Sequence, residues 1–299
     1  MALMVPTLNA GAPWRTWLKA LRAQNLRCEI HVIDSDSNDE TAALACNAGL
    51  NVTVIERSTF NHGATRNLLL TLAPQAELLI YLTQDAILAD PNALQTLLNA
   101  FDDPQVGVAY GRQLPRPGAG PLGAFARYFN YPAQSNRRTL VDAPRLGIKA
   151  AFSSNAFAAY RRECLESLGG FPDQVILGED TLLAGRALQA GWTLAYCAEA
   201  CVYHSHDYSF MEEFRRNFDI GVMHAREAWF RQTFGAAEGE GLRFVKRLFS
   251  CLVRQAPWLI PQAIMHMAAK YAGYRLGMAE AHLPGKLKMY LSMHGGYWT

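Results

Sequence analysis

The sequence has no long uncharged segment and no marked excess of charge of one sign. No stretch free of Asp, Glu, Lys and Arg reaches the roughly 18–20 residues that a membrane-spanning helix needs. The first residues lack a basic segment followed by an apolar core, so no signal peptide is expected. The formal net charge of +2 gives no reason to expect a nucleic-acid partner. These absences argue against a secreted protein, an integral membrane protein and a nucleic-acid-binding protein.

Closely paired cysteines are also absent. The six cysteines form no C-x-x-C pair. In a chain of 299 residues they are expected to be reduced and mostly buried, as in a cytoplasmic protein. They are Cys28, Cys46, Cys164, Cys197, Cys201 and Cys251.

The charge is unevenly distributed along an otherwise ordinary globular composition. With 50% apolar and 18% charged residues, the chain is too apolar to be disordered. From Leu242 onward, however, eight basic residues face a single acidic one, Glu280. A basic, aromatic-rich end indicates an anionic surface as partner. The basic residues are Arg243, Lys246, Arg247, Arg254, Lys270, Arg275, Lys286 and Lys288.

Short apolar segments alternate with helical patterns through the first half of the chain. This alternation predicts an α/β fold with a mainly parallel, doubly wound sheet. Residues 112–150 are rich in Pro, Gly and Arg and are expected to form a long irregular loop. Short strands are expected near 194 and 202, and helices from 209 almost to the end. The strands expected in the first half are 2–5, 29–33, 51–55, 78–82 and 106–110.

Polar residues follow three of the expected strands. Thr7 and Asn9 follow the first, Asp34 and Asp36 the second, and Gln84 and Asp85 the fourth. In an open parallel sheet, ligands bind beyond the carboxyl ends of the strands. Carboxylates there accept hydrogen bonds from a ribose or base, or bind a hard cation. The alternative is that Asp34 and Asp36 are turn and cap residues.

Three further patterns involve polar side chains at expected helix starts or strand ends. Residues 37–40 (Ser-Asn-Asp-Glu) predict a capping box that opens a helix. Glu179 and Asp180 either favour a helix dipole or supply a general base. His204 and His206, two residues apart on a strand, share one face, which suits a metal ion or a phosphate. They are also compatible with ordinary surface histidines.

The order of these motifs resembles a family 2 glycosyltransferase with the GT-A fold, and in particular its rhamnosyltransferase branch. The similarity covers about residues 5–235. The matching segments are VPTLNAG (5–11), VIDSDSNDET (32–41), FNHGATRN (60–67), LTQDA (82–86), YGRQLP (110–115), FNYP (129–132), GFP (170–172), GED (178–180), VYHSHDYS (202–209) and EFRR (213–216).

The resemblance implies an inverting transferase that moves L-rhamnose from dTDP-rhamnose to a saccharide or lipid-linked saccharide during bacterial surface polysaccharide (O-antigen) synthesis. Asp180 is the expected general base, with Glu179 as the second choice. Mg²⁺ or Mn²⁺ is expected at Asp85 with His204 and His206, because Gln84-Asp85-Ala86 stands where the family has Asp-x-Asp. Residues implied at the nucleotide or donor are Pro6, Thr7, Asn9, Asp34, Asp36, Arg66, Gln84 and Asp85. Residues implied at the acceptor or diphosphate are Arg112, Asn155, Arg215 and Arg216.

The expected domain organisation is a GT-A catalytic domain at 1–240 and a basic helical C-terminal region at 241–299. The catalytic domain divides into a nucleotide-sugar half, about 1–112, and an acceptor half, about 113–240. Residues 243–288 are expected to contact the inner face of the cytoplasmic membrane as an amphipathic surface. The alternative is that they pack on the catalytic domain or on a second subunit. The apolar residues behind this expectation are Trp258, Leu259, Ile260, Ile264, Tyr271, Tyr274 and Leu276.

Three other functions compete with this one. The first is a family 2 transferase that uses a UDP- or GDP-sugar. The second is a catalytically inactive relative that binds a nucleotide-sugar or serves as a scaffold, which the incomplete Asp-x-Asp favours. The third is a nucleotidyltransferase of sugar 1-phosphates, which would need basic residues in the loop after the first strand. That loop, 6–11, contains neither Lys nor Arg.

Overall fold

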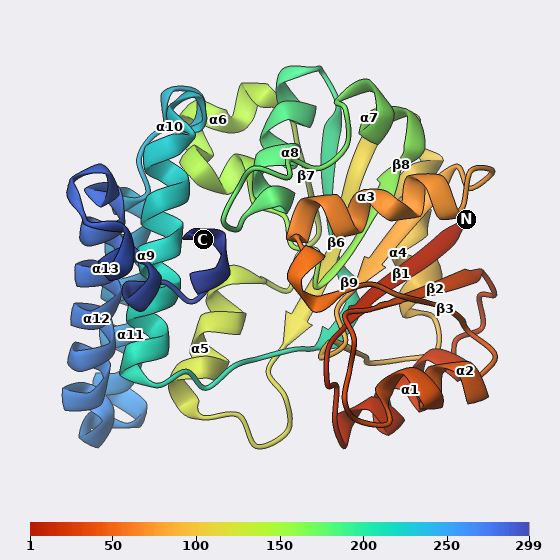
Figure 1. Ribbon diagram of the computed structural model, residues 1–299. Helices are drawn as coiled ribbons and strands as arrows, with labels where there is room; N and C mark the ends of the chain where they lie inside the picture. The colour runs from red at the N-terminus through yellow and green to blue at the C-terminus, as the bar shows by residue number, and fades with distance from the viewer. Residues whose placement is uncertain (299) are drawn as a thin grey trace.

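The computed structural model describes residues 1–298, which form one mixed sheet with helices on both faces (Figure 1). The nine strands of the described residues follow the order β3-β2-β1-β4-β8-β6-β9-β5, with β7 paired to β9. Their bounds are β1 (Ala2–Thr7), β2 (Glu29–Asp34), β3 (Asn51–Val54), β4 (Leu78–Leu82), β5 (Ile87–Leu88), β6 (Val106–Leu114), β7 (Asn136–Arg138), β8 (Phe157–Arg161) and β9 (Thr193–Tyr203).

The first four strands along the chain pair in parallel, as the alternating pattern predicts. Thr7 at the end of β1 lies opposite Asp34 at the end of β2, and β1 also pairs with β4. β8 runs antiparallel to both β4 and β6, whereas β6 and β9 are parallel. The carboxyl ends of β1, β2, β4, β6 and β9 therefore meet the amino end of β8 at one edge of the sheet. This edge is where ligands are expected.

Two parts of the secondary structure differ from the sequence prediction. A single strand, β9, replaces the two short strands expected near 194 and 202, and its register shifts opposite Gly111 and Arg112. The segment 112–150 is not one irregular loop, because it completes β6 and adds helices and the short strand β7. Pro121 opens a helix there, in keeping with the preference of proline for the first turn. A high Pro and Gly content therefore marks the ends of elements in this segment.

The predicted capping box at 37–40 is also wrong. The Ser37 hydroxyl donates to Asp34 Oδ1 at 2.7 Å and accepts from the Asn9 N–H at 2.8 Å. The helix begins at Thr41, after Glu40, with no side-chain cap. Ser37 is therefore used to hold the loop after β1.

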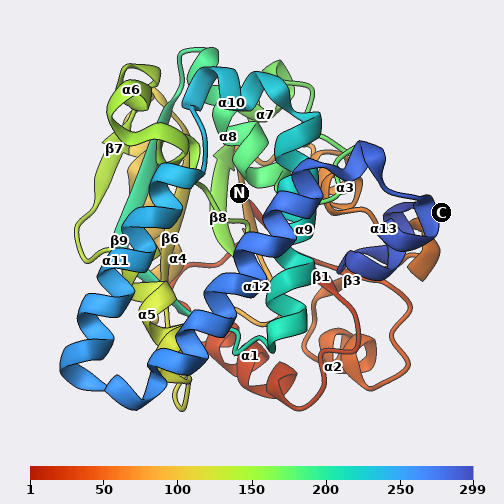
Figure 2. The ribbon, with the colours of Figure 1, turned by 90° about the vertical axis from the view of Figure 1, so that its left-hand side faces the viewer.

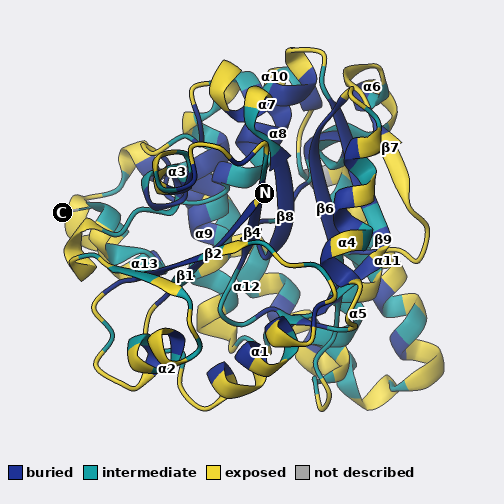
Figure 3. Cartoon of the chain, turned by 90° about the vertical axis from the view of Figure 1, so that its right-hand side faces the viewer, coloured by how far each residue is buried: buried dark blue, intermediate teal, exposed yellow. Residues whose placement is uncertain are grey.

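Helices cover both faces of the sheet. The bounds are α1 (Pro13–Arg22), α2 (Thr41–Asn47), α3 (His62–Leu72), α4 (Ala93–Leu98), α5 (Pro121–Asn130), α6 (Ala143–Leu146), α7 (Arg162–Ser167) and α8 (Glu179–Gln189). Alternate side chains of β1 enter different cores, because successive residues of a strand point to opposite faces. Leu3 and Val5 pack with α1, α2 and α4, while Met4 packs with α3, α7 and α8. Figure 3 shows the central strands buried and the outer sides of α1 and α2 largely exposed.

Five α-helices follow β9 in the described residues. They are α9 (Phe210–Arg226), α10 (Ala228–Phe234), α11 (Glu238–Gln255), α12 (Ile260–Met278) and α13 (Gly285–Leu291). α12 lies along α9 (Figures 1 and 2). A Cβ at Gly221, Gly273 or Gly277 would overlap backbone atoms of the facing helix, so glycine permits this close approach. No helix in residues 1–298 combines the length and the apolar character that crossing a bilayer requires.

Candidate active site

The loops after β1 and β2 are held together by buried polar contacts. Asp34 is fully buried, and its carboxylate accepts from the Thr7 hydroxyl at 2.8 Å and from the Ser37 hydroxyl and N–H. Pro6 precedes Thr7 in β1 and lies opposite Ile33. The neighbouring Asp36, by contrast, is exposed and adopts φ +56°. Asp34 therefore shapes the loop, while the Asp36 carboxylate is accessible from solvent.

The backbone after Thr7 adopts an unusual conformation that side chains support. Asn9 has φ +46°, and its side-chain oxygen accepts from the Asn38 N–H at 2.8 Å. The Gln84 amide forms two hydrogen bonds with the backbone of Leu8, at 2.8 and 3.1 Å. Gln84 thus ties the loop after β4 to the loop after β1, whereas the family's Asp-x-Asp pattern has a carboxylate at that position.

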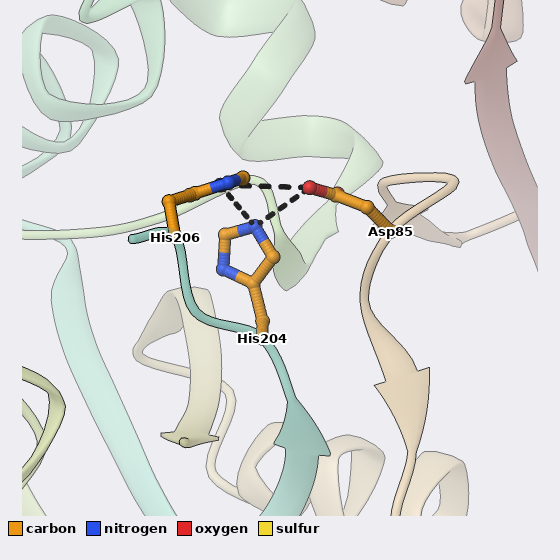
Figure 4. A group of neighbouring side chains, drawn as sticks. All are labelled: Asp85, His204 and His206. Carbon is orange, nitrogen blue, oxygen red and sulfur yellow. Dashed lines mark hydrogen bonds and ion pairs between the residues drawn. The ribbon is translucent and has the colours of Figure 1, made fainter. Parts of the chain in front are cut away.

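Asp85, His204 and His206 converge on one point at this edge (Figure 4). Asp85 Oδ2 lies 3.2 Å from His204 Nε2 and 3.5 Å from His206 Nε2, and the two Nε2 atoms are 3.1 Å apart. Two atoms that each lie about 2.1 Å from one cation are about 3.0 Å apart at octahedral angles and about 3.4 Å apart at tetrahedral angles. The three side chains therefore fit a shared divalent cation, with each contributing one ligand atom.

The charges around this cluster keep Asp85 ionised. Burial raises the pKa of Asp85, but the contact with His204 and the charges of His204 and His206 outweigh it and hold that pKa well below its usual range. Burial and the charge of His204 lower the pKa of His206 to about 4. Arg116 donates to the Asp85 backbone carbonyl at 2.6 Å and lies 3.6 Å from its carboxylate. At neutral pH, an ionised Asp85 and an uncharged His206 thus face the candidate cation position.

Glu179 and Asp180 form a second group, at the start of α8. The buried Glu179 accepts from Arg66 Nη1 at 3.1 Å and from Asn155 Nδ2 at 3.2 Å. Asp180 is partly exposed, and its carboxylate accepts from the N–H groups of Asn155 at 3.0 Å and Thr181 at 2.7 Å. The amino end of β8 therefore holds both carboxylates in place.

The two carboxyl groups titrate differently because their surroundings differ. Burial and the charge of Glu179 raise the pKa of Asp180 to about 6. Burial also raises the pKa of Glu179, but the charges of Arg66 and His62 outweigh it and lower that pKa. A raised pKa on a partly exposed carboxylate is what a general base working near neutral pH requires.

The arginines predicted from the sequence occupy different places. Arg66 lies at the second carboxylate group, where it pairs with Glu179. Arg112 donates to the Tyr131 carbonyl at 3.2 Å. Arg215 lies over the ring of Tyr290, at 5.4 Å from its centroid. Of these three, only Arg66 thus forms an ion pair with a carboxylate of the site.

Arg216 lies between the two groups. Burial lowers the pKa of both His62 and His206, and the charge of Arg216 lowers each further. Its guanidinium lies 5.8 Å from the centroid of Tyr208, which stacks on His206. A hollow of about 340 Å³ opens beside this stack, and its lining includes Arg116, Ser205, His206, Tyr208 and Glu212. Arg216 therefore brings positive charge to the space between the candidate cation position and Glu179.

Three polar residues of the site were not predicted from the sequence. Arg116 contacts Asp85, as described above. Gln113 contacts His204 and is itself contacted by Arg127. Gln113 lies in the matching segment YGRQLP, of which only Arg112 was assigned to the site, and Arg127 lies on α5, where no helix was expected.

The sequence and the fold both have close parallels among known proteins. The sequence model of the family described as "Glycosyltransferase like family 2" matches residues 1–219. The chain is 46% identical over 299 residues to the O-antigen chain rhamnosyltransferase WbaN of Salmonella anatum, covering 99% of this chain and 95% of that protein. It is also 46% identical over 301 residues to RfbN of Salmonella typhimurium, an O-antigen chain rhamnosyltransferase, covering 100% and 96%.

Solved structures share the fold at low sequence identity. The mannosyltransferase PcManGT from Pyrobaculum calidifontis, in complex with GDP-Man and Mn²⁺, has a TM-score of 0.58 and 22% identity, covering 99% of this chain and 84% of that one. Residues 1–349 of S. aureus TarS, in complex with UDP-GlcNAc, give 0.57 and 19%, covering 98% and 83%. The predicted GT-A fold is therefore confirmed. The chain belongs to the family 2 glycosyltransferases, within the branch that contains these O-antigen rhamnosyltransferases.

Proposed function

We propose that this enzyme transfers L-rhamnose from dTDP-rhamnose, with inversion, to a saccharide or lipid-linked saccharide during bacterial surface polysaccharide synthesis. The sugar is argued from the names of the relatives that are 46% identical over the whole chain. The chemistry is argued from one observation: a partly exposed carboxylate with a raised pKa lies on the same sheet edge as an Asp-His-His cluster.

The donor lies against the loops after β1, β2 and β4. Pro6, Thr7, Asn9 and Gln84 line the nucleoside, with Asp36 as the exposed carboxylate and Asp34 as the buried support. Asp85, His204 and His206 hold Mg²⁺ or Mn²⁺. When bound, the cation neutralises charge that develops on the departing diphosphate.

Asp180 removes the proton from the acceptor hydroxyl. That oxygen forms the new bond to the anomeric carbon while the bond from this carbon to the diphosphate oxygen breaks, so dTDP leaves and the proton stays on Asp180. With a pKa of about 6, the carboxylate is mostly ionised at pH 7 and still basic enough to accept a proton. One base and no covalent intermediate produce inversion at the anomeric carbon.

Positive charge and hydrogen-bond donors complete the site. Arg216, Arg112 and Arg215 contact the diphosphate or the acceptor, and the position of Arg216 beside Tyr208 and His206 supports this role most directly. Asn155 positions both Glu179 and Asp180. Glu179, whose carboxylate is already paired with Arg66, supports the base.

Calorimetric titration with dTDP, UDP, GDP and CMP, with Mg²⁺ and with EDTA, tests the donor. Selective, metal-aided binding of dTDP is expected. Selective binding of UDP or GDP would support a glycosyltransferase whose donor is a UDP- or GDP-sugar instead of dTDP-rhamnose. Absence of binding to any nucleotide would favour the inactive or scaffold alternative. The Asp180→Asn variant should bind dTDP as the wild type does but should not transfer the sugar. Full transferase activity of this variant would show that Asp180 is not the base.

We also propose that the catalytic domain, residues 1–240, works at the inner face of the cytoplasmic membrane through the helical region 241–299. Trp258, Ile264 and Tyr271 are 74%, 54% and 61% exposed around α12. The basic residues Arg254 and Arg275 are exposed beside them, as at an anionic lipid surface. Two residues that were expected on this surface from the sequence are not on it: Leu259 and Ile260 pack against the small core formed by α11 and α12.

Flotation with vesicles tests the membrane contact. Anionic phosphatidylglycerol vesicles should carry the protein, and phosphatidylcholine vesicles should carry less of it. The double change Trp258→Ser and Ile264→Ser should reduce flotation. Val141→Ser is the control, because Val141 is 87% exposed but lies outside α11 and α12. Equal flotation of both variants would refute the contact, and dimerisation lost in the double variant would favour a homo-oligomer.

A further inference from the structure

Gln113, in the last part of β6, joins the two groups of the active site. Its side chain is 2% exposed. The amide oxygen lies 2.8 Å from His204 Nδ1 and 2.5 Å from Arg127 Nη1. The amide nitrogen donates to Ser154 Oγ at 2.9 Å. Ser154 directly precedes Asn155, whose N–H donates to Asp180.

The arginine determines which way the amide points. A guanidinium only donates hydrogen bonds, so the Gln113 atom next to Arg127 is the oxygen. A flipped amide would place its NH₂ group against the guanidinium, donor against donor. In the observed orientation all three partners, Arg127, His204 and Ser154, are satisfied by one buried side chain.

This orientation in turn determines the tautomer of His204. Because the Gln113 oxygen can only accept, His204 Nδ1 must carry the hydrogen. In the neutral ring, Nε2 then carries the lone pair, and Nε2 is the atom 3.2 Å from Asp85 and 3.1 Å from His206 Nε2. A histidine binds a metal through the nitrogen that lacks a hydrogen, with its tautomer set by the partner of the other nitrogen.

We propose that Gln113, fixed by Arg127, is a positioning residue that holds His204 as a cation ligand through Nε2 and links it to the segment Ser154–Asn155, whose backbone binds Asp180. This inference rests on the cation site proposed at Asp85, His204 and His206. Gln113 touches neither the cation position nor the donor. It acts through His204 on one side and through Ser154 and Asn155 on the other.

The first test measures the wild-type protein and uses a variant only to assign the signal. Long-range ¹H–¹⁵N spectra of the wild-type protein, without metal and at pH 8, report the tautomer of each histidine. The His204→Gln variant identifies the His204 signal by its absence. We expect hydrogen on Nδ1 of His204. A neutral ring with hydrogen mainly on Nε2 would overturn the inference, whatever happens to any variant.

The second test measures binding of Mn²⁺ alone, by electron paramagnetic resonance of the free ion. Gln113→Leu should weaken Mn²⁺ binding about 10- to 100-fold, as loss of such a partner does in other metal sites. Gln113→Glu should stay within a few-fold of the wild type, because its carboxylate still accepts from His204 and Arg127. Ser154→Ala is the matched control: it removes only the partner of the amide nitrogen and should leave Mn²⁺ affinity nearly unchanged.

The outcomes separate the two proposals. If the wild type binds no Mn²⁺, the cation site itself is wrong and this inference falls with it. If the wild type binds Mn²⁺ and Gln113→Leu binds it equally well, only the role of Gln113 is wrong. That role is also wrong if Gln113→Glu loses as much affinity as Gln113→Leu, or if Ser154→Ala does.

Discussion

The raised pKa of Asp180 predicts that the enzyme is less stable than it would be without this carboxylate charge. In the folded protein, burial and the neighbouring Glu179 raise the pKa of Asp180 from its ordinary 3.8 to about 6. A carboxyl group whose pKa is raised by folding binds more protons in the folded state than in the unfolded state. Stability therefore falls as the pH rises from about 4 to about 6, and the loss persists at higher pH.

The magnitude follows from the change in pKa. Because one pKa unit corresponds to about 1.4 kcal/mol, the ionised Asp180 lowers the free energy of unfolding by at most about 3 kcal/mol at pH 7. It is an upper limit because the side chain keeps some contact with solvent. Asp180→Asn removes this charge at every pH. It also loses one of two hydrogen bonds from the N–H groups of Asn155 and Thr181, a cost that does not change with pH.

Urea unfolding of wild type and Asp180→Asn, followed by tryptophan fluorescence from pH 4 to pH 8, isolates the charge. The free energy of unfolding of the variant, minus that of the wild type, should increase by up to about 3 kcal/mol across this range. Asp102→Asn is the control, because Asp102 is exposed at the end of the 3-10 helix after α4. If the difference between the two free energies of unfolding is the same at pH 4 and pH 8, the argument that Asp180 carries a buried charge is refuted.

The kcat/KM of the wild type should also fall below pH about 6, as Asp180 becomes protonated. A kcat/KM that is unchanged down to pH 5 would contradict the role of Asp180 as the base.

Two further predictions concern stability alone. Arg66→Met should lower the free energy of unfolding by about 3–5 kcal/mol in the same urea titration, because it leaves the buried Glu179 without its ion-pair partner. The control Arg15→Met breaks an exposed ion pair and should lower it by about 0–1 kcal/mol. Equal losses would contradict the burial argument. Gly277→Ala should overpack the α9–α12 contact, which lowers the melting temperature and reduces the free energy of unfolding by about 1–3 kcal/mol. In the control Gly239→Ala the new methyl group on α11 meets open space, so the free energy of unfolding should be unchanged or increase by up to about 1 kcal/mol. A stabilised Gly277→Ala would show that the two helices lie further apart.

The parallel half of the fold could be predicted because its signals are local. Each of the first four strands is a short local segment, three of them end in polar residues, and the helices between them have their own patterns. The order of the second half has no such signal. β8 inserts between β4 and β6, and β9 pairs with β6, through contacts between residues far apart in the sequence. The antiparallel direction of β8 depends on the arrangement of the whole sheet, which no local sequence pattern describes.

The same distinction applies to the candidate site. Asp85, His204 and His206 were grouped in advance only because the family resemblance supplied their proximity; the residues alone allowed two surface histidines. Ser37 shows how a local rule fails. Its position satisfies the capping-box pattern, yet the fold brings Asp34 and Asn9 within hydrogen-bond distance of its hydroxyl. A buried carboxylate needs partners more than an exposed helix start does, so the tertiary contact prevails.

The position of Arg66 shows how the fold assigns a residue to one group of the site. The family resemblance implied that Arg66 lies near the base or diphosphate of the nucleotide. In the structure, α3 lies so close to the loop after α7 that a Cβ on Gly63 would overlap the carbonyl oxygen of Pro172. Asn67 also bonds to Phe171 in the same loop, accepting from its N–H and donating to its carbonyl at 2.8 and 2.9 Å. This contact brings Arg66 to Glu179, so Gly63 of the His-Gly motif sets the position of the guanidinium that pairs with Glu179, the residue next to Asp180.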